Sequence, residues 1–418
     1  MLKPSNDDTL TTLKAIECPD ATYPARAPSL VMQRGLGSHV FDVEGREFVD
    51  LCAGFGALAL GHNPPAHQSV LAARIAQSGD TRAPLITHGM GDVYASDAKV
   101  ALLEYLIGML PPSLSVAAVA LTGAQAVELA IKTAIIATQR SRFVVFSGGY
   151  HGLDLGLLAL TDREAFRAPF AGFCVADKVE TAPFLCDEAT LDAALCSRQV
   201  AAVLVEPVQG RAGVRQAPVA WLAMLRQVCD RYGTLLVYDE VFTGLGRTGH
   251  MTYANQVPCD LLCLGKALGG GFPLSACVGT RSAMAAWPSS TGEALHTGTF
   301  FGHPLSCAVG LATLRQIDAD QLVERSSRLG GKALGLLRDL LGQERRVKEV
   351  RGTGLMLAIE FRQHGVGAKL MDLLRTRGII ALASGRYGET LSITPALNIP
   401  EELLLTACRI IVDCIASI

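Results

Sequence analysis

The chain has 418 residues, enough for a large core, and this length predicts one large domain together with a smaller one. The net charge of -2 and the lack of a basic block argue against a nucleic-acid partner. No uncharged apolar stretch reaches the roughly 18 residues of a membrane span, and the first eight residues lack the apolar core of a signal peptide. We therefore expect a cytoplasmic protein whose 12 scattered cysteines stay reduced. Cys259 and Cys263 have no second cysteine pair or histidine cluster beside them, so we expect no metal site.

The first part of the chain predicts an arm followed by a pair of strands. Residues 1–35 contain an early polar stretch and an extended segment with prolines, which we expect to be only partly ordered. Residues 40–50 are typical of two strands around a turn at Glu44-Gly45. A glycine-rich passage follows at residues 54–64.

Between about residues 95 and 280, apolar runs alternate with helical patterns. We expect strands at residues 115–121, 143–146, 201–205, 235–238 and 261–264, and helices at residues 124–136 and 218–232. This alternation predicts a parallel sheet with helices on both faces, in which ligands bind at the carboxyl ends of the strands. Gly123, Glu206, Asp239 and Lys266 lie at or just after strand ends, so we expect them to meet in one crevice.

After about residue 315 the pattern changes to that of a smaller α+β domain. We expect helices at residues 321–341, 367–377 and 401–415, and strands at residues 355–361 and 391–394. The chain is therefore predicted to divide into three segments. Residues 1–65 form the arm and part of the small domain, residues 66–314 form the large cofactor-binding domain, and residues 315–418 complete the small domain.

A lysine and a carboxylate at two of the strand ends suit one chemistry. Lysine is costly to bury, but the amine of Lys266 there can form a Schiff base with pyridoxal phosphate (PLP). The carboxylate of Asp239 can keep the pyridine nitrogen protonated, and Val241 would then pack against the ring face. Alone, Lys266 is better explained as a solvated strand-end lysine and Asp239 as a helix cap, but together they favour cofactor chemistry.

Four turns add candidate ligands for the same cofactor. Gly123 and Ala124 begin a helix whose backbone N–H groups suit a phosphate. Tyr150, in a glycine-rich turn, presents a ring that can stack on a flat heterocycle. Glu206 follows a strand, and Thr299 offers a hydroxyl group to a phosphate. Each has an ordinary alternative explanation, respectively a strand-to-helix turn, a surface loop, a strand-end acid and a helix cap.

These motifs, in this order, resemble the class III PLP-dependent aminotransferases of fold type I, a group that includes acetylornithine, ornithine and 4-aminobutyrate aminotransferases. The resemblance extends from Phe41 to Pro395. It implies an α/β fold, with a large domain around a mostly parallel central sheet and a smaller α+β domain built from the two chain ends. It also implies a homodimer with shared active sites. By this resemblance, Lys266 forms the Schiff base and shuttles the proton, and Asp239 pairs with the pyridine nitrogen. Tyr150 and Val241 sandwich the ring, Gly123 and Ala124 bind the phosphate, and Glu206 supports the site. Thr299 reaches the phosphate of the neighbouring subunit, and Phe55 lines the substrate pocket.

Several positions depart from the family pattern on the substrate side. Arg211 stands where many relatives have a glutamate, and Ser392 stands where many have the arginine that binds the substrate α-carboxylate. Serine cannot reproduce a bidentate carboxylate clamp, so we hypothesise that Arg211 binds the carboxylate from the opposite wall. The Arg211→Ala variant should then raise KM for carboxylate substrates selectively. The alternative is a solvated surface arginine. Three further departures, at Phe242, Gln125 and His303, leave the cofactor chemistry intact.

The leading interpretation is an aminotransferase that moves an amino group from an amine or amino-acid donor to a keto-acid or aldehyde acceptor. An amino-acid racemase, epimerase or aminomutase of the same fold needs the same Lys266 and Asp239, so only net formation of a keto product separates the two. A binding protein that keeps the fold without catalysis is a third interpretation, which the intact lysine and carboxylate disfavour. The sequence names neither the donor nor the acceptor.

Overall fold

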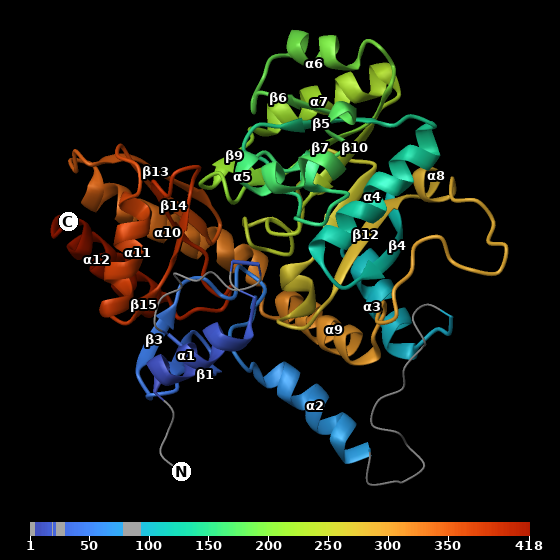
Figure 1. The fold of residues 1–418 in the computed structure, drawn as a ribbon. Helices are drawn as coiled ribbons and strands as arrows, with labels where there is room; N and C mark the ends of the chain where they lie inside the picture. Colours follow the sequence, from blue (N-terminus) through green and yellow to red (C-terminus); the bar gives the residue numbers. More distant parts are fainter. Residues whose placement is uncertain (1–4, 19, 22–29, 78–92) are drawn as a thin grey trace.

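The computed structural model describes residues 5–18, 20–21, 30–77 and 93–418. A seven-stranded sheet in the order β4-β12-β11-β10-β7-β5-β6 forms its centre (Figure 1). Neighbouring strands among β6, β5, β7, β10 and β11 pair in parallel, whereas β12 runs antiparallel to β11 and β4. The expected mostly parallel sheet is therefore confirmed. Its strands are β4 (Leu114–Ala120), β5 (Arg142–Phe146), β6 (Val179–Ala182), β7 (Val200–Val205), β10 (Leu235–Asp239), β11 (Leu261–Leu264) and β12 (Ser275–Thr280).

Helices cover both faces of this sheet because its strands are apolar on both sides. In β5, Phe143 and Val145 pack in one core cluster with Val127 of the helix α4, while Val144 packs in the other with Leu222 of the helix α7. Successive strand residues point to opposite faces, so a continuous apolar run buries both. The helices of this region are α2 (Pro65–Gln77), α3 (Asp97–Gly108), α4 (Gly123–Thr138), α5 (Glu164–Arg167), α6 (Glu188–Leu195), α7 (Val219–Tyr232), α8 (Arg281–Met284) and α9 (Pro304–Ala319).

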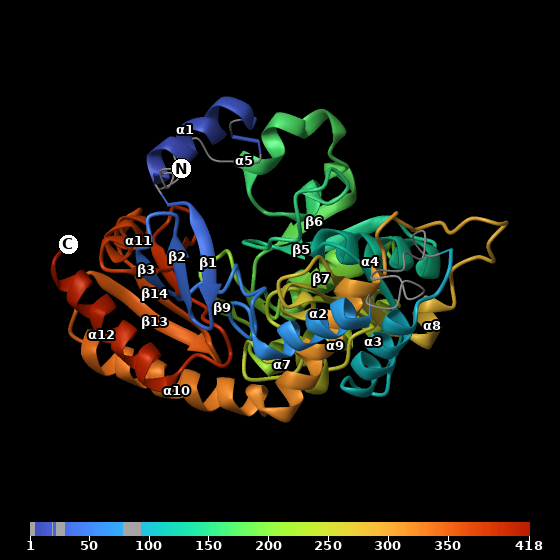
Figure 2. The same cartoon turned by 90° about the horizontal axis from the view of Figure 1, so that it is seen from below.

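The two ends of the described chain meet beside the large sheet, as Figures 1 and 2 show. Val49 of β3 pairs in parallel with Ile379 of β15, which joins the N-terminal strands to the C-terminal part. One four-stranded sheet consists of β1 (Met32–Leu36), β2 (His39–Asp42), β3 (Glu47–Asp50) and β15 (Ile379–Ile380). A second consists of β13 (Val347–Thr353), β14 (Met356–Phe361), β17 (Thr390–Ile393) and β16 (Leu382–Ser384), and it is accompanied by α10 (Leu322–Leu341), α11 (Val366–Thr376) and α12 (Glu401–Ala416).

The N-terminal region, expected to be a partly ordered arm, includes a helix that the sequence analysis did not predict. It contains the helix α1 (Asn6–Ile16), whose first turn is capped by the Ser5 hydroxyl accepting from the Asp8 N–H at 3.0 Å. Residues 1–4, 19 and 22–29 of that expected arm lie outside the described residues. The two expected strands around Glu44-Gly45 are confirmed as β2 and β3. A small hairpin, β8 (Val208–Gln209) with β9 (Arg215–Gln216), follows β7 and carries the turn with Arg211.

Candidate active site

The carboxyl ends of three neighbouring strands bring Glu206, Asp239 and Lys266 to one crevice. Glu206 directly follows β7, Asp239 is the last residue of β10, and Lys266 begins a short 3-10 helix two residues after β11. Because β10 lies between β7 and β11, the side chains come from adjacent positions on one sheet edge. The charges of Asp239 and Glu206 both act to raise the pKa of Lys266, as expected of groups that share a site.

Lys266 combines backbone strain with a perturbed amine. Its φ of 42° lies in the left-handed region that side chains other than glycine rarely adopt, and such strain is held where the surroundings over-determine it. Burial lowers the pKa of the Lys266 amine to about 8, against the opposing charges of Asp239 and Glu206. The Nζ atom lies 3.8 Å from the centroid of the Phe242 ring. A neutral, nucleophilic amine is therefore accessible close to neutral pH.

His151 is a partner of Asp239 that the sequence analysis did not identify. Its Nδ1 donates to Asp239 Oδ2 at 2.8 Å, and both side chains are buried. The other carboxylate oxygen, Oδ1, accepts from the Val241 N–H at 3.2 Å. The two donors fix the orientation of the carboxylate. His151 belongs to the glycine-rich turn of Tyr150, but 88 residues separate it from Asp239, so only the fold reveals the contact.

Glu206 forms hydrogen bonds to two loops at the edge of the crevice, one with Tyr150 and one with Gly210. Its carboxylate accepts from the Tyr150 N–H at 2.8 Å and from the Gly210 N–H at 3.2 Å. Burial raises the pKa of Glu206 to about 7, an effect that Asp239 reinforces and His151 opposes. Since these bonds hold the turn before His151 and the turn before Arg211, Glu206 acts by positioning both loops.

The start of α4 supplies unpartnered backbone donors at the same sheet edge. The Thr122 hydroxyl accepts from the Gln125 N–H at 3.2 Å, and the Gln125 side chain returns the bond in a capping box. Among the described residues, no acceptor occupies the N–H groups of Gly123 and Ala124. A Cβ atom on Gly123 would lie 2.6 Å from Val241 Cγ1, so only glycine lets the helix start come this close to Val241.

These groups match the polar atoms of PLP. Two unpartnered N–H groups at a helix start suit the phosphate, the carboxylate of Asp239 suits the pyridine nitrogen, and the amine of Lys266 suits the carbonyl carbon. Val241 connects the helix start with Asp239, because its side chain lies against Gly123 and its N–H donates to the Asp239 carboxylate. The donor set of the crevice therefore fits this cofactor.

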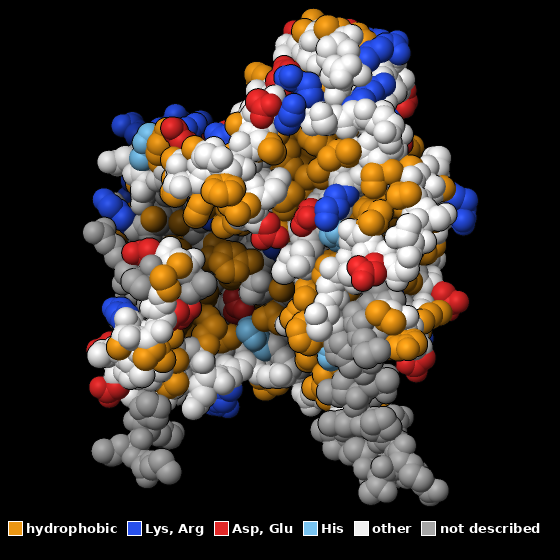
Figure 3. All heavy atoms as spheres, turned by 45° about the vertical axis from the view of Figure 1, so that its right-hand side comes forward, with side chains coloured by type: hydrophobic (Ala, Val, Ile, Leu, Met, Phe, Trp, Pro, Cys, Tyr) orange, Lys and Arg blue, Asp and Glu red, His pale blue; other side chains and the backbone are white. Residues whose placement is uncertain are grey.

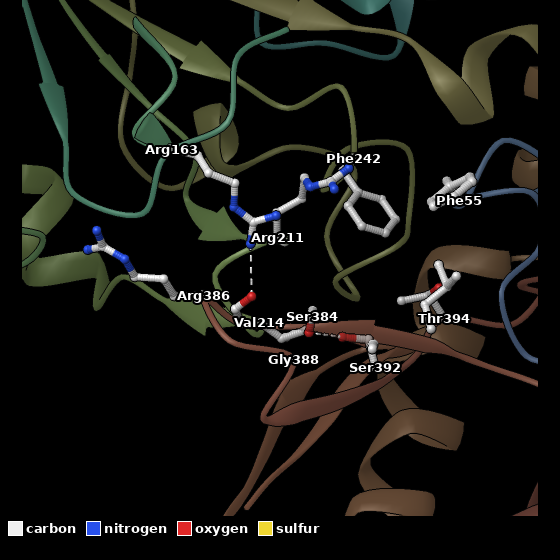
Figure 4. Close-up of a pocket in the computed structure, with 14 residues that line it drawn as sticks. Phe55, Arg163, Arg211, Val214, Phe242, Ser384, Arg386, Gly388, Ser392 and Thr394 are labelled. Atoms are coloured by element: carbon white, nitrogen blue, oxygen red, sulfur yellow. Dashed lines mark hydrogen bonds between the residues drawn. The ribbon is translucent and has the colours of Figure 1, made fainter. Parts of the chain in front are cut away.

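A cavity of about 220 Å³ adjoins the crevice and contains the predicted substrate residues Phe55 and Arg211 (Figure 4). Phe242 forms another wall, wedged between two glycines: a Cβ atom would lie 2.6 Å from its ring on Gly56 and 2.5 Å from it on Gly210. The guanidinium carbon of Arg211, although the residue is exposed, lies 4.8 Å from the Tyr150 ring centroid. The remaining lining residues are Arg163, Val214, Leu382, Ala383, Ser384, Gly385, Arg386, Gly388, Ser392 and Thr394, together with Gly210.

Thr299 is not among the residues that line the cavity. It is exposed in the segment between α8 and α9, which extends away from the sheet in Figure 1. Ser392 lines the cavity, and its hydroxyl lies 2.5 Å from that of Ser384.

In the described ranges, no three metal-binding side chains gather into a cluster. None of the helices described is both long and apolar enough to cross a membrane.

Comparison with known proteins gives a consistent result. The family model described as aminotransferase class-III matches residues 22–415. The chain is 34% identical over 379 residues to an acetylornithine aminotransferase of Methanosarcina mazei, covering 89% of this chain and 88% of that protein. It is 33% identical over 409 residues to the 5-aminovalerate aminotransferase DavT of Pseudomonas putida, covering 91% and 92%.

Solved structures of similar fold agree with these matches. An ornithine aminotransferase from Toxoplasma gondii aligns with a TM-score of 0.89 at 26% identity, covering 99% of this chain and 96% of that one. An amine transaminase from an uncultivated Pseudomonas species, in a PLP-bound form, aligns with a TM-score of 0.84 at 26% identity, covering 96% and 98%. The similarity therefore spans the large sheet and both chain ends.

Proposed function

Because the chain belongs to the class III aminotransferases, it is a PLP-dependent enzyme, and we propose that Lys266 is the amine that holds the cofactor. The enzyme moves an amino group from an amine or amino-acid donor to a keto-acid or aldehyde acceptor. When bound, PLP supplies the electron sink that stabilises negative charge at the carbon next to the transferred nitrogen. The protein supplies the attachment, the orientation and the proton transfer.

Lys266 is proposed to act twice, first as nucleophile and then as base. Its pKa of about 8 leaves part of the population neutral near pH 7.5, and the neutral amine is the form that attacks a carbonyl carbon. With PLP and a donor bound, Lys266 Nζ would be the base that takes a proton from the donor carbon and later returns it. The ring of Phe242, whose centroid lies 3.8 Å from Nζ, restricts the positions open to the amine.

Asp239 is proposed to hold the proton on the pyridine nitrogen. His151 and the Val241 N–H occupy one lone pair on each carboxylate oxygen and prevent rotation of the group. Tyr150 and Val241 are proposed to contact the two ring faces, and Gly123 with Ala124 to bind the phosphate. The support is the set of described contacts that places these groups around one sheet edge.

We propose a homodimer with shared active sites, in which Thr299 completes the phosphate site of the neighbouring subunit. Thr299 is exposed in the segment between α8 and α9, which extends away from the sheet in Figure 1. Hydrophobic side chains are exposed across the face in Figure 3, as in surfaces that pair with another subunit. Mixing Lys266→Ala and Thr299→Ala subunits tests this, because a hybrid dimer then contains one intact site. Complementation of activity is expected, and its absence would contradict site sharing.

On the substrate side, we propose that Phe55 and Arg211 contact the donor and the acceptor. Arg211 lies in the cavity wall and over Tyr150, so its guanidinium group can reach a carboxylate held near the ring. Ser392 is bonded to Ser384, a neutral pair that does not clamp a carboxylate. We further propose a cytoplasmic location, in keeping with buried thiols such as Cys259 and Cys263. We also propose that the chain divides into domains at residues 65 and 314, and the pairing of β3 with β15 supports this division.

The main observation in support of the proposed site is that the Lys266 amine, with its lowered pKa, shares the crevice with the Asp239 carboxylate, which His151 holds in one orientation. The test is borohydride reduction of the PLP-loaded enzyme followed by peptide mass spectrometry, with Lys266→Ala as control. Labelling at Lys266 is expected, and labelling at another lysine would refute the assignment. A panel of amines and amino acids is then scored for keto or aldehyde product. Loss of optical activity without such a product would favour a racemase or epimerase.

A further inference from the structure

Two arginines lie together in the wall of the cavity. Arg163 and Arg211 both line it, and their guanidinium carbons lie 5.5 Å and 5.7 Å from the centroid of one ring, that of Phe166. Figure 4 shows the two side chains next to each other on one side of Val214, Ser384 and Gly388, whereas the guanidinium group of Arg386 points away from them. One wall of the cavity therefore carries concentrated positive charge.

Among the residues that the structure describes, no acidic side chain forms an ion pair with Arg163 or Arg211. The guanidinium group of Arg163 donates to the Gly385 carbonyl at 2.9 Å, and the adjacent Asp162 lies 3.9 Å from Arg167 instead. Glu389 is the acid whose charge acts on Arg163, but its carboxylate accepts backbone N–H groups of its own loop at 3.2 Å and 2.7 Å. Burial, then the charge of Arg211, lowers the pKa of Arg163, and the charge of Glu389 opposes this only in part.

The cavity connects the arginine pair with the amine of Lys266. Phe242 lines the cavity, and Lys266 Nζ lies 3.8 Å from its ring centroid. Arg211 is also one of the charges that lower the pKa of Lys266. A molecule whose reacting carbon is at Lys266 would extend past Phe242 and place its far end at Arg211 and Arg163. The opposite wall is neutral, formed in part by the bonded Ser384 and Ser392.

We propose that Arg163 and Arg211 form a two-arginine subsite for an anionic group at the far end of the substrate, and that Arg163 is a specificity-determining residue. This inference rests on the proposed function, because it places the reacting carbon at Lys266. The chemistry recognised is that of a carboxylate or a phosphate, since a guanidinium fork donates paired N–H groups to either. Two adjacent forks hold such an anion from two sides, and it removes the mutual repulsion of the two cations.

The test uses three non-reacting probes of similar length: pentanoate, butyl phosphate and 1-pentanol. Their dissociation constants for the PLP-loaded enzyme are measured from the absorbance of the bound cofactor. We expect Arg163→Gln to weaken both anions about tenfold and to leave the alcohol unchanged, because a bond to a charged group is lost. Arg163→Lys, which keeps the charge without the fork, should lose less affinity. The ratio of the phosphate and carboxylate constants identifies the preferred end group, and either preference supports the subsite.

Arg409→Gln is the matched control, because it removes the same charge from an exposed position on α12. Equal weakening of both anions by Arg409→Gln and Arg163→Gln would overturn the proposal, and so would equal weakening of the alcohol and the anions. Thermal unfolding of each variant shows whether the lost bond to Gly385 disturbs the fold. If borohydride labelling falls on a lysine other than Lys266, the proposed function fails. Probe binding that still depends on Arg163 would then show that the anion site exists without serving this reaction.

Discussion

Replacing His151 with phenylalanine should weaken cofactor binding without unfolding the protein. The bond from His151 Nδ1 to Asp239 is 2.8 Å long and buried, and the substitution removes it while keeping an aromatic ring of similar size. A hydrogen bond to a charged group contributes about 1.5–3 kcal/mol. At about 1.4 kcal/mol per factor of ten, the apparent dissociation constant for PLP should rise roughly 10- to 150-fold. The Val241 N–H would remain as the described donor to Asp239.

The assay is a fluorescence titration of the apoenzyme with PLP, supported by thermal unfolding to show that each variant is folded. His250→Phe is a suitable control, because His250 packs edge-on against Tyr253, with ring centroids 5.4 Å apart, and does not contact Asp239. His151→Gln keeps an N–H donor and should retain more affinity than His151→Phe. A folded His151→Phe variant whose dissociation constant for PLP lies within about twofold of that of the unsubstituted protein would refute the argument. Equal losses of PLP affinity in His151→Phe and His250→Phe would show that the effect comes from general packing and not from the bond to Asp239.

Three other predictions follow from the same geometry. Because burial lowers the pKa of Lys266 to about 8, the rate of PLP uptake by the apoenzyme, followed by stopped-flow absorbance, should rise with pH through an inflection near 8; an inflection near 10 would contradict this. The pKa of Glu206 is raised to about 7, so folding favours its protonated form, and its contribution to stability is full below pH 4.5 and is lost as the pH rises to 7. Urea unfolding at several pH values measures the free energy of unfolding of the original protein and of Glu206→Gln. The value for the original protein, relative to that for the variant, should fall between pH 4.5 and pH 7, and a difference independent of pH would exclude a raised pKa at Glu206. Gly210→Ala should cost about 1–3 kcal/mol through overpacking, since its Cβ atom would lie 2.5 Å from Phe242, and less in a Phe242→Leu background; equal costs in the two backgrounds would show that Phe242 is not the obstacle.

Sequence patterns predicted the elements whose apolar residues are contiguous. The expected strand at residues 261–264 is β11 with the same bounds, and the expected helix at residues 218–232 is α7 to within one residue. Continuous apolar runs are the signature of strands buried on both faces, so their ends, and with them Asp239 and Lys266, could be located. The helix α1 was missed because its residues are mostly polar and exposed, so they show little apolar periodicity.

The contacts of the site were less accessible, because they join residues distant in the sequence. His151 and Arg163 lie in or after a glycine-rich turn, and nothing local distinguishes them from loop residues. Phe242 could be identified as an unusual residue, but the two glycines that make room for it become apparent only in three dimensions. Arg211 is exposed and also lines the cavity, and its role in binding a carboxylate stays a prediction.

The charge at the substrate end and the basicity of Lys266 should be coupled. Burial is the main cause of the lowered Lys266 pKa, and the positive charge of Arg211 adds to it. An anion bound at Arg211 neutralises this contribution, so it should raise the Lys266 pKa and make the released amine a stronger base. We expect saturating pentanoate to move the pH inflection of PLP uptake upward in the original enzyme and to leave it unmoved in Arg211→Gln. An identical shift in both proteins would mean that the anion acts elsewhere, and no shift in either would show that the two ends of the cavity titrate independently.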